Sequence, residues 1–286
     1  MRHLFACVTF LGFGAIFVAP ASAAVIYNNL TPTNAMAIAS RPGGPGVFEI
    51  EAADDFLLGS QATINSASFV GLLVPGTGGT PSVSEIVVEI YRVFPKDSNT
   101  VRTPNVPTRV NSPSDVAVLD RDSAAGELTF GTSVLSPTFT ALNSVQPGGI
   151  HPSPVQTTGG NGALTGQEVQ FNITFTTPFD LAADHYFFVP QVLLTNGGQF
   201  YWLSASRPIS GAGTTPFAPD LQAWTRDEFL DPDWLRVGTD IVGGATPPTF
   251  NAAFSLNGNA VPEPSTIVLL LTALTIIGLR RCRAVQ

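Results

Sequence analysis

The sequence is poor in cysteine, lysine and charged residues. Its 286 residues include two cysteines, Cys7 and Cys282, and charged residues make up 12%, about half the usual share of a globular chain. Both cysteines lie near the ends, so the body between them has no disulfide framework, cysteine nucleophile or thiolate metal site. Lys96 is the only lysine and lies outside any Gly-Lys-Ser/Thr motif, which excludes a Walker-type phosphate loop.

Histidine is scarce as well, and the common catalytic motifs built on it are missing. Beyond the first residues the chain has only His151 and His185, and neither belongs to a His-Glu-x-x-His pair. No Gly-x-Ser-x-Gly motif occurs. His185 follows Asp184 at the expected start of a strand, where a polar residue capping the strand is favoured over a general base.

Basic residues are few, and the net charge is −8. Four of the 13 basic residues lie at the two ends, so the body is more acidic still. Nucleic-acid binding relies on positive charge that neutralises phosphates. The composition therefore excludes that class of partner.

What the chain has in quantity is glycine, proline and apolar residues, with 27 Gly, 24 Pro and 20 Phe. Prolines and glycines at this density break helical heptads but suit short strands joined by turns. Residues 168–176 alternate strictly between apolar and polar types, as in a half-buried strand. We expect further strands at residues 48–58, 64–74, 84–94, 126–135, 185–195, 200–204 and 250–256. The pattern predicts an all-β body, an antiparallel β-sandwich that is jelly-roll-like.

A Gly- and Pro-rich stretch at residues 138–163 predicts a long loop. It separates the chain into two halves, and neither half offers enough strands for its own sandwich. We therefore expect one domain over residues 24–260.

The first 23 residues are typical of a secretory signal. A short polar start precedes an apolar run at residues 4–18, and Ala21 and Ala23 occupy the small-residue positions before a cleavage site. We expect signal peptidase to cut before Ala24. The alternative, an uncleaved membrane helix, is disfavoured because the run is short and ends in Pro20.

The C-terminal residues 261–286 combine a proline-containing strip, an apolar segment and a basic end. The strip consists of Val261, Pro262, Glu263 and Pro264, and the basic end contains Arg280, Arg281 and Arg283. Between them, residues 267–279 predict a transmembrane helix that rises about 20 Å, short of a hydrocarbon core of about 30 Å. The arginines favour a cytoplasmic end, which places the body outside.

This tail resembles the PEP-CTERM sorting signal of Gram-negative bacteria in order, spacing and position. The resemblance implies processing by an exosortase, a membrane-embedded cysteine transpeptidase that cuts near the Pro-Glu-Pro. It also implies an inner-membrane intermediate, followed by release to the cell surface or the exopolysaccharide of a biofilm matrix. Features of the body also resemble the β-rich bodies found on this tail, including Tyr27-Asn28-Asn29 and Asp54-Asp55-Phe56. The tail does not fix what the body does.

Two clusters in the body are candidate binding sites. Asp227, Glu228, Asp231 and Asp233 form an oxygen-rich segment that suits Ca²⁺, although Leu235 stands where an EF-hand has its third ligand. An exposed acidic loop is the favoured alternative. Trp224 and Trp234 bracket this segment and are candidates for stacking on sugars if they are exposed, whereas core packing is the commoner fate of tryptophan and the one expected for Trp202.

Two functions stay open from the sequence. The first is a non-catalytic surface or matrix protein, with or without glycan binding. The second is a secreted glycan hydrolase or lyase that uses two carboxylates, for which Asp54 with Asp55 or Glu49 with Glu51 are nominal pairs. A groove with two facing carboxylates about 5 to 9.5 Å apart would favour the enzyme. A loop-capped sandwich would favour the first function.

Overall fold

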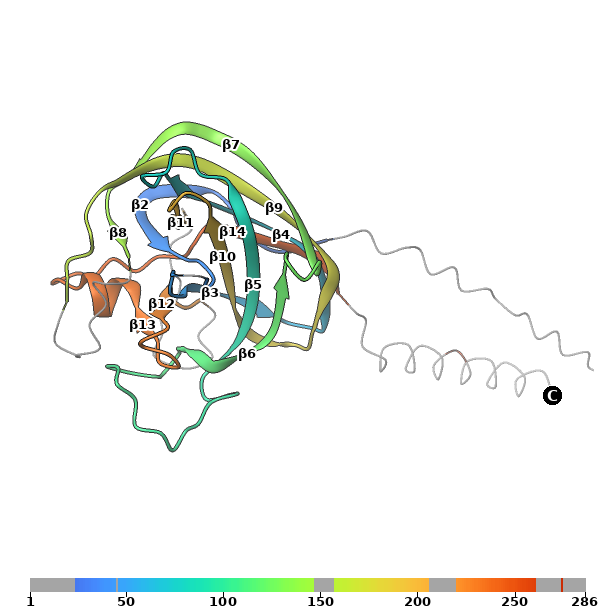
Figure 1. Ribbon diagram of the computed structural model, residues 1–286. Helices are drawn as coiled ribbons and strands as arrows, with labels where there is room; N and C mark the ends of the chain where they lie inside the picture. Colours follow the sequence, from blue (N-terminus) through green and yellow to red (C-terminus); the bar gives the residue numbers. More distant parts are fainter. Residues whose placement is uncertain (1–23, 45, 147–156, 206–219, 261–273, 275–286) are drawn as a thin grey trace, which may run out of the picture.

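The computed structural model describes residues 24–44, 46–146, 157–205, 220–260 and Leu274. These residues form fourteen strands and one short π-helix, so the fold is all-β as predicted (Figure 1). The strands are β1 (Ala24–Asn29), β2 (Pro32–Ala39), β3 (Ile50–Leu58), β4 (Ala62–Val74), β5 (Val83–Val93), β6 (Pro113–Asp122), β7 (Leu128–Ala141), β8 (Ser144–Val145), β9 (Leu164–Leu181), β10 (Asp184–Leu194), β11 (Gln199–Ala205), β12 (Trp224–Asp227), β13 (Leu235–Arg236) and β14 (Phe254–Ala260), and the π-helix is η1 (Val237–Val242).

The strands are hydrogen-bonded as one large sheet that folds into two layers. In the first layer β7 pairs with β9 and β9 with β4, whose other edge is shared by β14 and β11. Beyond these, β14 pairs with β1 and β11 with β2. The second layer runs β6, β5, β10, β3, β12 and β13. The turn between β10 and β11 joins the layers, and the pairs are antiparallel except the short pair of β2 with β8.

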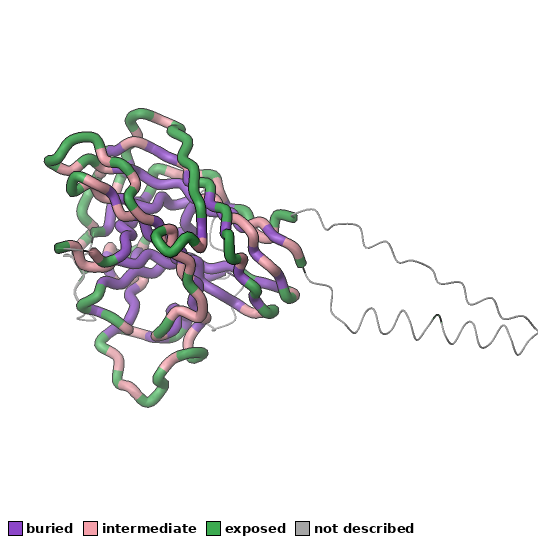
Figure 2. Tube along the Cα trace, turned by 45° about the vertical axis from the view of Figure 1, so that its right-hand side comes forward, coloured by how far each residue is buried: buried purple, intermediate pink, exposed green. Residues whose placement is uncertain are grey.

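Aromatic side chains fill the space between the layers. Phe188 of β10 stacks on Phe254 of β14, with ring centroids 5.0 Å apart, and also contacts Phe69 of β4 and Trp202 of β11. These rings are fully buried. Figure 2 shows the buried residues in the middle of the body and the exposed ones around its rim. Burial of several aromatic rings, each removing about 150 to 250 Å² from water, is the main force that holds the layers together.

The outer face of the second layer is covered as well. Ala53, Phe187 and Val189 lie on this face because they alternate with core residues along β3 and β10. Trp224 and Trp234 pack over them. A sheet that is buried on both sides needs apolar residues on both, which explains why these strands show weaker alternation than β9.

The predicted strands are largely confirmed, and the predicted loop is partly wrong. The windows at 64–74, 84–94, 185–195 and 200–204 lie within one or two residues of β4, β5, β10 and β11. The 138–163 window is not all loop, because β7 continues to Ala141 and Ser144–Val145 pairs with β2. The window at 250–256 begins too early, since β14 starts at Phe254. Residues 147–156 lie outside the described part of the chain.

Several short or polar strands were not predicted. These are β1, β2, β6, β8, β12 and β13, which lack a clear alternating pattern in the sequence. The predicted signal at residues 1–23 and the tail at 261–286 lie outside the described residues, apart from Leu274. Within the described residues, no helix has the length and apolar character needed to cross a membrane.

The clearest strand offers a paired test of the layer packing. Phe171 of β9 is fully buried and stacks on Phe69 with centroids 4.8 Å apart, so Phe171→Asp should destabilise the fold by about 4 kcal/mol or more. Asn172 is exposed, and its Oδ1 accepts hydrogen bonds from Ser68 and Gln170. A carboxylate can accept the same bonds, so Asn172→Asp should change stability by about 0.5 kcal/mol or less. Thermal unfolding measures both, and equal melting temperatures would contradict the assigned faces.

Candidate functional site

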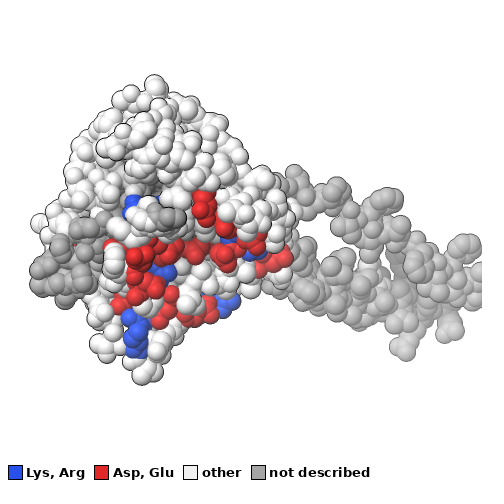
Figure 3. Space-filling view, viewed as in Figure 1, with Lys and Arg blue, Asp and Glu red and all other residues white. Residues whose placement is uncertain are grey.

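The charged residues gather on one part of the surface. Figure 3 shows a band of acidic and basic side chains across the lower half of the body, whereas the region over β7 and β9 carries almost none. On the outer face of the second layer lies a largely buried group that we call the carboxylate cluster. It consists of Glu49, Glu51, Glu89, Tyr91, Gln191 and Arg226.

Strand alternation and pairing bring the carboxylate cluster together. Glu51 lies on β3 directly opposite Arg226 of β12. Glu89 and Tyr91 are two residues apart on β5 and therefore share a face. Gln191 of β10 donates from Nε2 to Glu49 Oε1 at 2.9 Å. Residues from distant parts of the chain thus meet on one side of one sheet.

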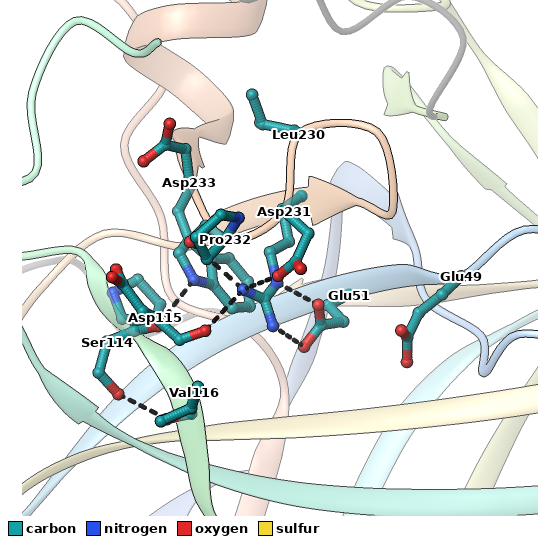
Figure 4. Close-up of polar contacts among 12 residues, drawn as sticks. Glu49, Glu51, Ser114, Asp115, Val116, Leu230, Asp231, Pro232 and Asp233 are labelled. Carbon is teal, nitrogen blue, oxygen red and sulfur yellow. Dashed lines mark hydrogen bonds and ion pairs between the residues drawn. The ribbon is translucent and has the colours of Figure 1, made fainter. Parts of the chain in front are cut away.

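Arg226 is the hub of these contacts. Its guanidinium pairs with Glu51 through Nε and, at 3.1 Å, through Nη2, and it donates to the Tyr91 hydroxyl at 2.8 Å. Nη1 lies 2.7 Å from Asp231 Oδ1 and also donates to the backbone carbonyl of Asp115. Figure 4 shows Glu51 of β3, Asp115 of β6 and Asp231 of the turn after β12 around this group. Burial lowers the pKa of Arg226, but the charges of Glu51 and its other partners outweigh this and raise it. The arginine is therefore charged and saturated with acceptors.

Arg226 also packs against two aromatic rings that contact each other. The guanidinium carbon lies 4.4 Å from the centroid of Trp234 and 5.2 Å from that of Tyr91. Arginine is favoured at buried pairs of this kind because its planar group can bind a carboxylate and stack on rings at once. Removing one partner of such a buried pair costs about 3 to 5 kcal/mol.

Glu89 behaves as a neutral acid in this setting. Burial and the neighbouring charge of Glu51 raise the pKa of Glu89 to about 9, so the carboxyl is protonated at neutral pH and hydrogen-bonds to Glu51. The Tyr91 hydroxyl donates to Glu51 Oε1 at 2.7 Å. Burial and Glu51 also raise the pKa of Glu49. The carboxylate of Glu51 is thus paired with the positive charge of Arg226.

The arrangement suits a structural role better than hydrolysis. Glycosidases hold their two carboxyl groups about 5 to 9.5 Å apart so that a sugar bond, or a water, fits between them. Of the nominal pair Glu49 and Glu51, Glu51 is buried and paired with Arg226, and Glu49 accepts a hydrogen bond from Gln191. The carboxylate cluster therefore anchors β12 and the following turn to the sheet.

The other nominal pair, Asp54 and Asp55, is split by the strand. As neighbours on β3 they point to opposite faces. Asp54 is fully buried between the layers and accepts the Ala252 N–H at 2.8 Å, and burial followed by the charge of Asp55 raises its pKa. Asp55 accepts the Leu221 N–H and lies 2.5 Å from His185 Nε2. Burial raises the pKa of Asp55, opposed by His185.

The four predicted calcium ligands do not converge. Asp227 Oδ1 accepts the N–H groups of Phe229 and Leu230 and so caps a turn, and Glu228 is exposed. Asp231 pairs with Arg226, as described above. Asp233 is buried, pairs with Arg102 and accepts the Asn105 N–H at 2.9 Å. Across the described residues, no three His, Cys, Asp or Glu side chains are placed to hold a metal ion.

The two candidate sugar-stacking tryptophans are buried. Trp224 and Trp234 are each 1% exposed, and Trp234 donates from Nε1 to the Ser114 carbonyl at 3.2 Å. The interpretation that their rings are exposed for stacking is therefore wrong. Their apolar surface covers the second layer instead. Trp202 lies in the core, as expected.

A surface cavity of about 330 Å³ lies at the ends of β4, β7 and β9. Its wall consists of Leu73, Gly166, Gln167, three prolines and three threonines, with no titratable side chain among them. It shares no residue with the carboxylate cluster. The cavity therefore does not provide the pair of facing carboxylates that a glycosidase needs.

Comparison with known proteins adds no relative. Neither a protein-family model, nor a curated protein, nor a solved structure matches this chain.

The carboxylate cluster was not predicted from the sequence, although the sequence pattern puts two of its residues on the same face of a strand. Alternation along residues 84–94 put Glu89 and Tyr91 on one face, which could have flagged a glutamate beside buried apolar residues. Arg226 stood out as a lone basic residue among four acids. Arg226 meets Glu89 and Tyr91 only because β12 pairs with β3. This pairing joins residues far apart in the chain, such as Glu51 and Thr225, which are 174 positions apart.

The state of Glu89 predicts how stability depends on pH. Its pKa is raised in the folded state from an ordinary 4.5 to about 9, so between these values the folded chain binds a proton that the unfolded chain releases. Stability from this group is therefore present at low pH and is lost as pH rises toward 9, by at most about 1.4 kcal/mol per pH unit.

Glu89→Gln, which mimics the protonated acid, should flatten the decline in stability between pH 5 and 9 that chemical denaturation measures in the wild type. Glu228→Gln, at an exposed position, is the matched control and should leave the decline unchanged. An identical pH profile for Glu89→Gln and the wild type would contradict the assigned proton.

Proposed function

We propose that this protein is a non-catalytic, exported surface or exopolysaccharide-matrix protein that signal peptidase and an exosortase process at its two ends. The observation that carries this proposal is the pairing of the first and last strands. Among the described residues, β1 reaches back to Ala24, the residue expected to follow the signal, and β14 reaches Ala260, which precedes the Val261-Pro262-Glu263-Pro264 strip. Ala24 lies opposite Gly258 in the register.

This pairing places both processing points at the same end of two neighbouring strands. The proposed membrane intermediate would hold the body by one corner, with the proline-containing strip next to the last strand. A proline strip cannot continue a β-ladder or a helix freely, which favours an extended substrate for a protease.

The contacts of the described buried carboxylates support the non-catalytic part of the proposal. The buried carboxylates of the second layer are engaged with Arg226, His185 and backbone N–H groups rather than facing a groove. The chain also crosses repeatedly between the layers, as in jelly rolls, so a jelly-roll-like sandwich remains part of this proposal.

We propose that a matrix glycan contacts an uncharged part of the outer face of the first layer, which we call the uncharged face. Two rungs of paired residues cross four strands on this face, one through Thr129, Thr174, Ser66 and Asn257, the other through Gly131, Asn172, Ser68 and Ser255. Hydroxyl and amide groups both donate and accept hydrogen bonds, as sugar hydroxyls do. The lack of charge here suits a neutral polysaccharide.

Sorting is tested by changing the strip. Pro262, Glu263 and Pro264 replaced together by alanine should let the apolar segment extend upstream as helix and leave an uncleaved precursor in the membrane. The wild type should begin at Ala24 and lack the C-terminal arginines when N-terminal sequencing and mass spectrometry are applied to surface material. Recovery of surface protein that begins at Met1 or is intact through Gln286 would contradict the processing route.

Glycan contact is tested separately on an array of neutral and charged glycans, with and without Ca²⁺. Asn172→Glu with Thr174→Glu places two charges in the middle of the uncharged face and should lower binding to neutral glycans at least about tenfold. Thr100→Glu, at an exposed position outside this face, should bind as the wild type does. Binding to charged glycans alone, or binding that survives the double change, would overturn this surface assignment.

A further inference from the structure

β7 is the outermost strand of the first layer. It pairs with β9 on one side, and no described strand pairs with its other side. The register with β9 is unbroken from Leu128 opposite Phe175 to Val134 opposite Val169 and becomes irregular only beyond Val134. The N-terminal half of β7 therefore presents a regular row of backbone N–H and C=O groups to its open side.

This half of β7 is exposed on both faces, although it forms part of a two-layer body. Residues 129–135 are all exposed. Phe130 and Val134 lie on the core-facing side, opposite Ile173 and Val169, yet they are 38% and 56% exposed while both partners are 1% exposed. The strand thus projects past the cover of the second layer and leaves apolar side chains on its inner side only partly covered.

The other edge strands of the described body are charged, short or irregular, features that disfavour pairing with another chain, whereas β7 is long and uncharged. β6 carries four charged residues in ten positions, namely Asp115, Asp120, Arg121 and Asp122. β1 is six residues long with an irregular register, and β8 and β13 have two residues each. β7 has fourteen residues and no charge. Long uncharged edges of this kind pair readily with another strand.

We propose that the open edge of β7, over residues 129–135, pairs antiparallel with the same edge of a second copy of this chain. A two-fold axis perpendicular to the sheet keeps the inner sides of both copies on one side. With the axis at Thr132, Phe130 of each copy then lies opposite Val134 of the other. The pairing covers the apolar groups that one copy leaves exposed.

Charge argues for a second copy as the occupant. The chain is strongly acidic, so contact between two copies through the charged band would bring like charges together. The β7 edge lies in the region of Figure 3 that carries almost no charge, where self-pairing avoids that repulsion. Because this edge carries no charge, charge complementarity does not favour a different, positively charged protein over a second copy. The pairing continues the two rungs of the uncharged face into the second copy, but it does not depend on glycan binding or on sorting.

The test is the mass of the full chain in density-matched detergent, measured by sedimentation over a range of concentrations. The wild type should change from one chain to two as concentration rises. Phe130→Lys with Val134→Lys should remain a single chain to concentrations at least about tenfold higher. Val101→Lys with Val116→Lys adds the same charge at exposed valines outside β7 and should associate as the wild type does.

Hydrogen exchange of the wild type provides a measurement that needs no variant to fold. Amides within residues 129–135 should exchange more slowly as concentration rises, because half of them gain partners across the new pair. A wild type that stays a single chain throughout would overturn the proposal. Association that persists unchanged in the Phe130→Lys, Val134→Lys variant, or without protection of these amides, would overturn it as well and place the contact in the tail or elsewhere.

Discussion

The contact of Phe188 with Phe254 is the interaction on which the rest of the fold depends. Phe188 lies at the middle of β10, and Phe254 begins β14, so their stacked rings join the two layers at the point where Phe69 and Trp202 also meet. Because residues alternate along a strand, fixing these rings inward fixes Phe187 and Val189 outward. The outer face of β10 then needs its own cover, which the chain between Leu221 and Trp234 supplies.

That cover explains why an acidic chain buries charge on the second layer. The segment is held down by Arg226, and its positive charge is matched by Glu51 while Glu89 stays protonated. A buried ion pair adds little net stability, because each group loses its hydration, but it fixes one register of β12 on β3. Acids that the sequence suggested as metal ligands or catalytic pairs instead form ion pairs with arginines or accept hydrogen bonds from backbone N–H groups.

The two layers therefore differ in where their charged residues lie. The second layer concentrates charge in internal contacts, and the first layer presents the uncharged face and the uncharged edge of β7 to its surroundings. The paired end strands leave both ends of the body at one corner. The function proposed above would make use of such a body, since neutral contacts are not screened by salt.

The sequence by itself determined the all-β class and most of the long strands, because alternation such as that of Phe171 and Asn172 is a local property. It also defined the two end segments as candidate signals, since composition and order carry that information. Only the tertiary structure decided which acids are partners of Arg226, that Asp54 and His185 lie on opposite faces of one sheet, and that Trp224 and Trp234 are covered. These outcomes depend on which strands pair, and pairing between β3 and β12 joins residues so far apart that no local pattern records it.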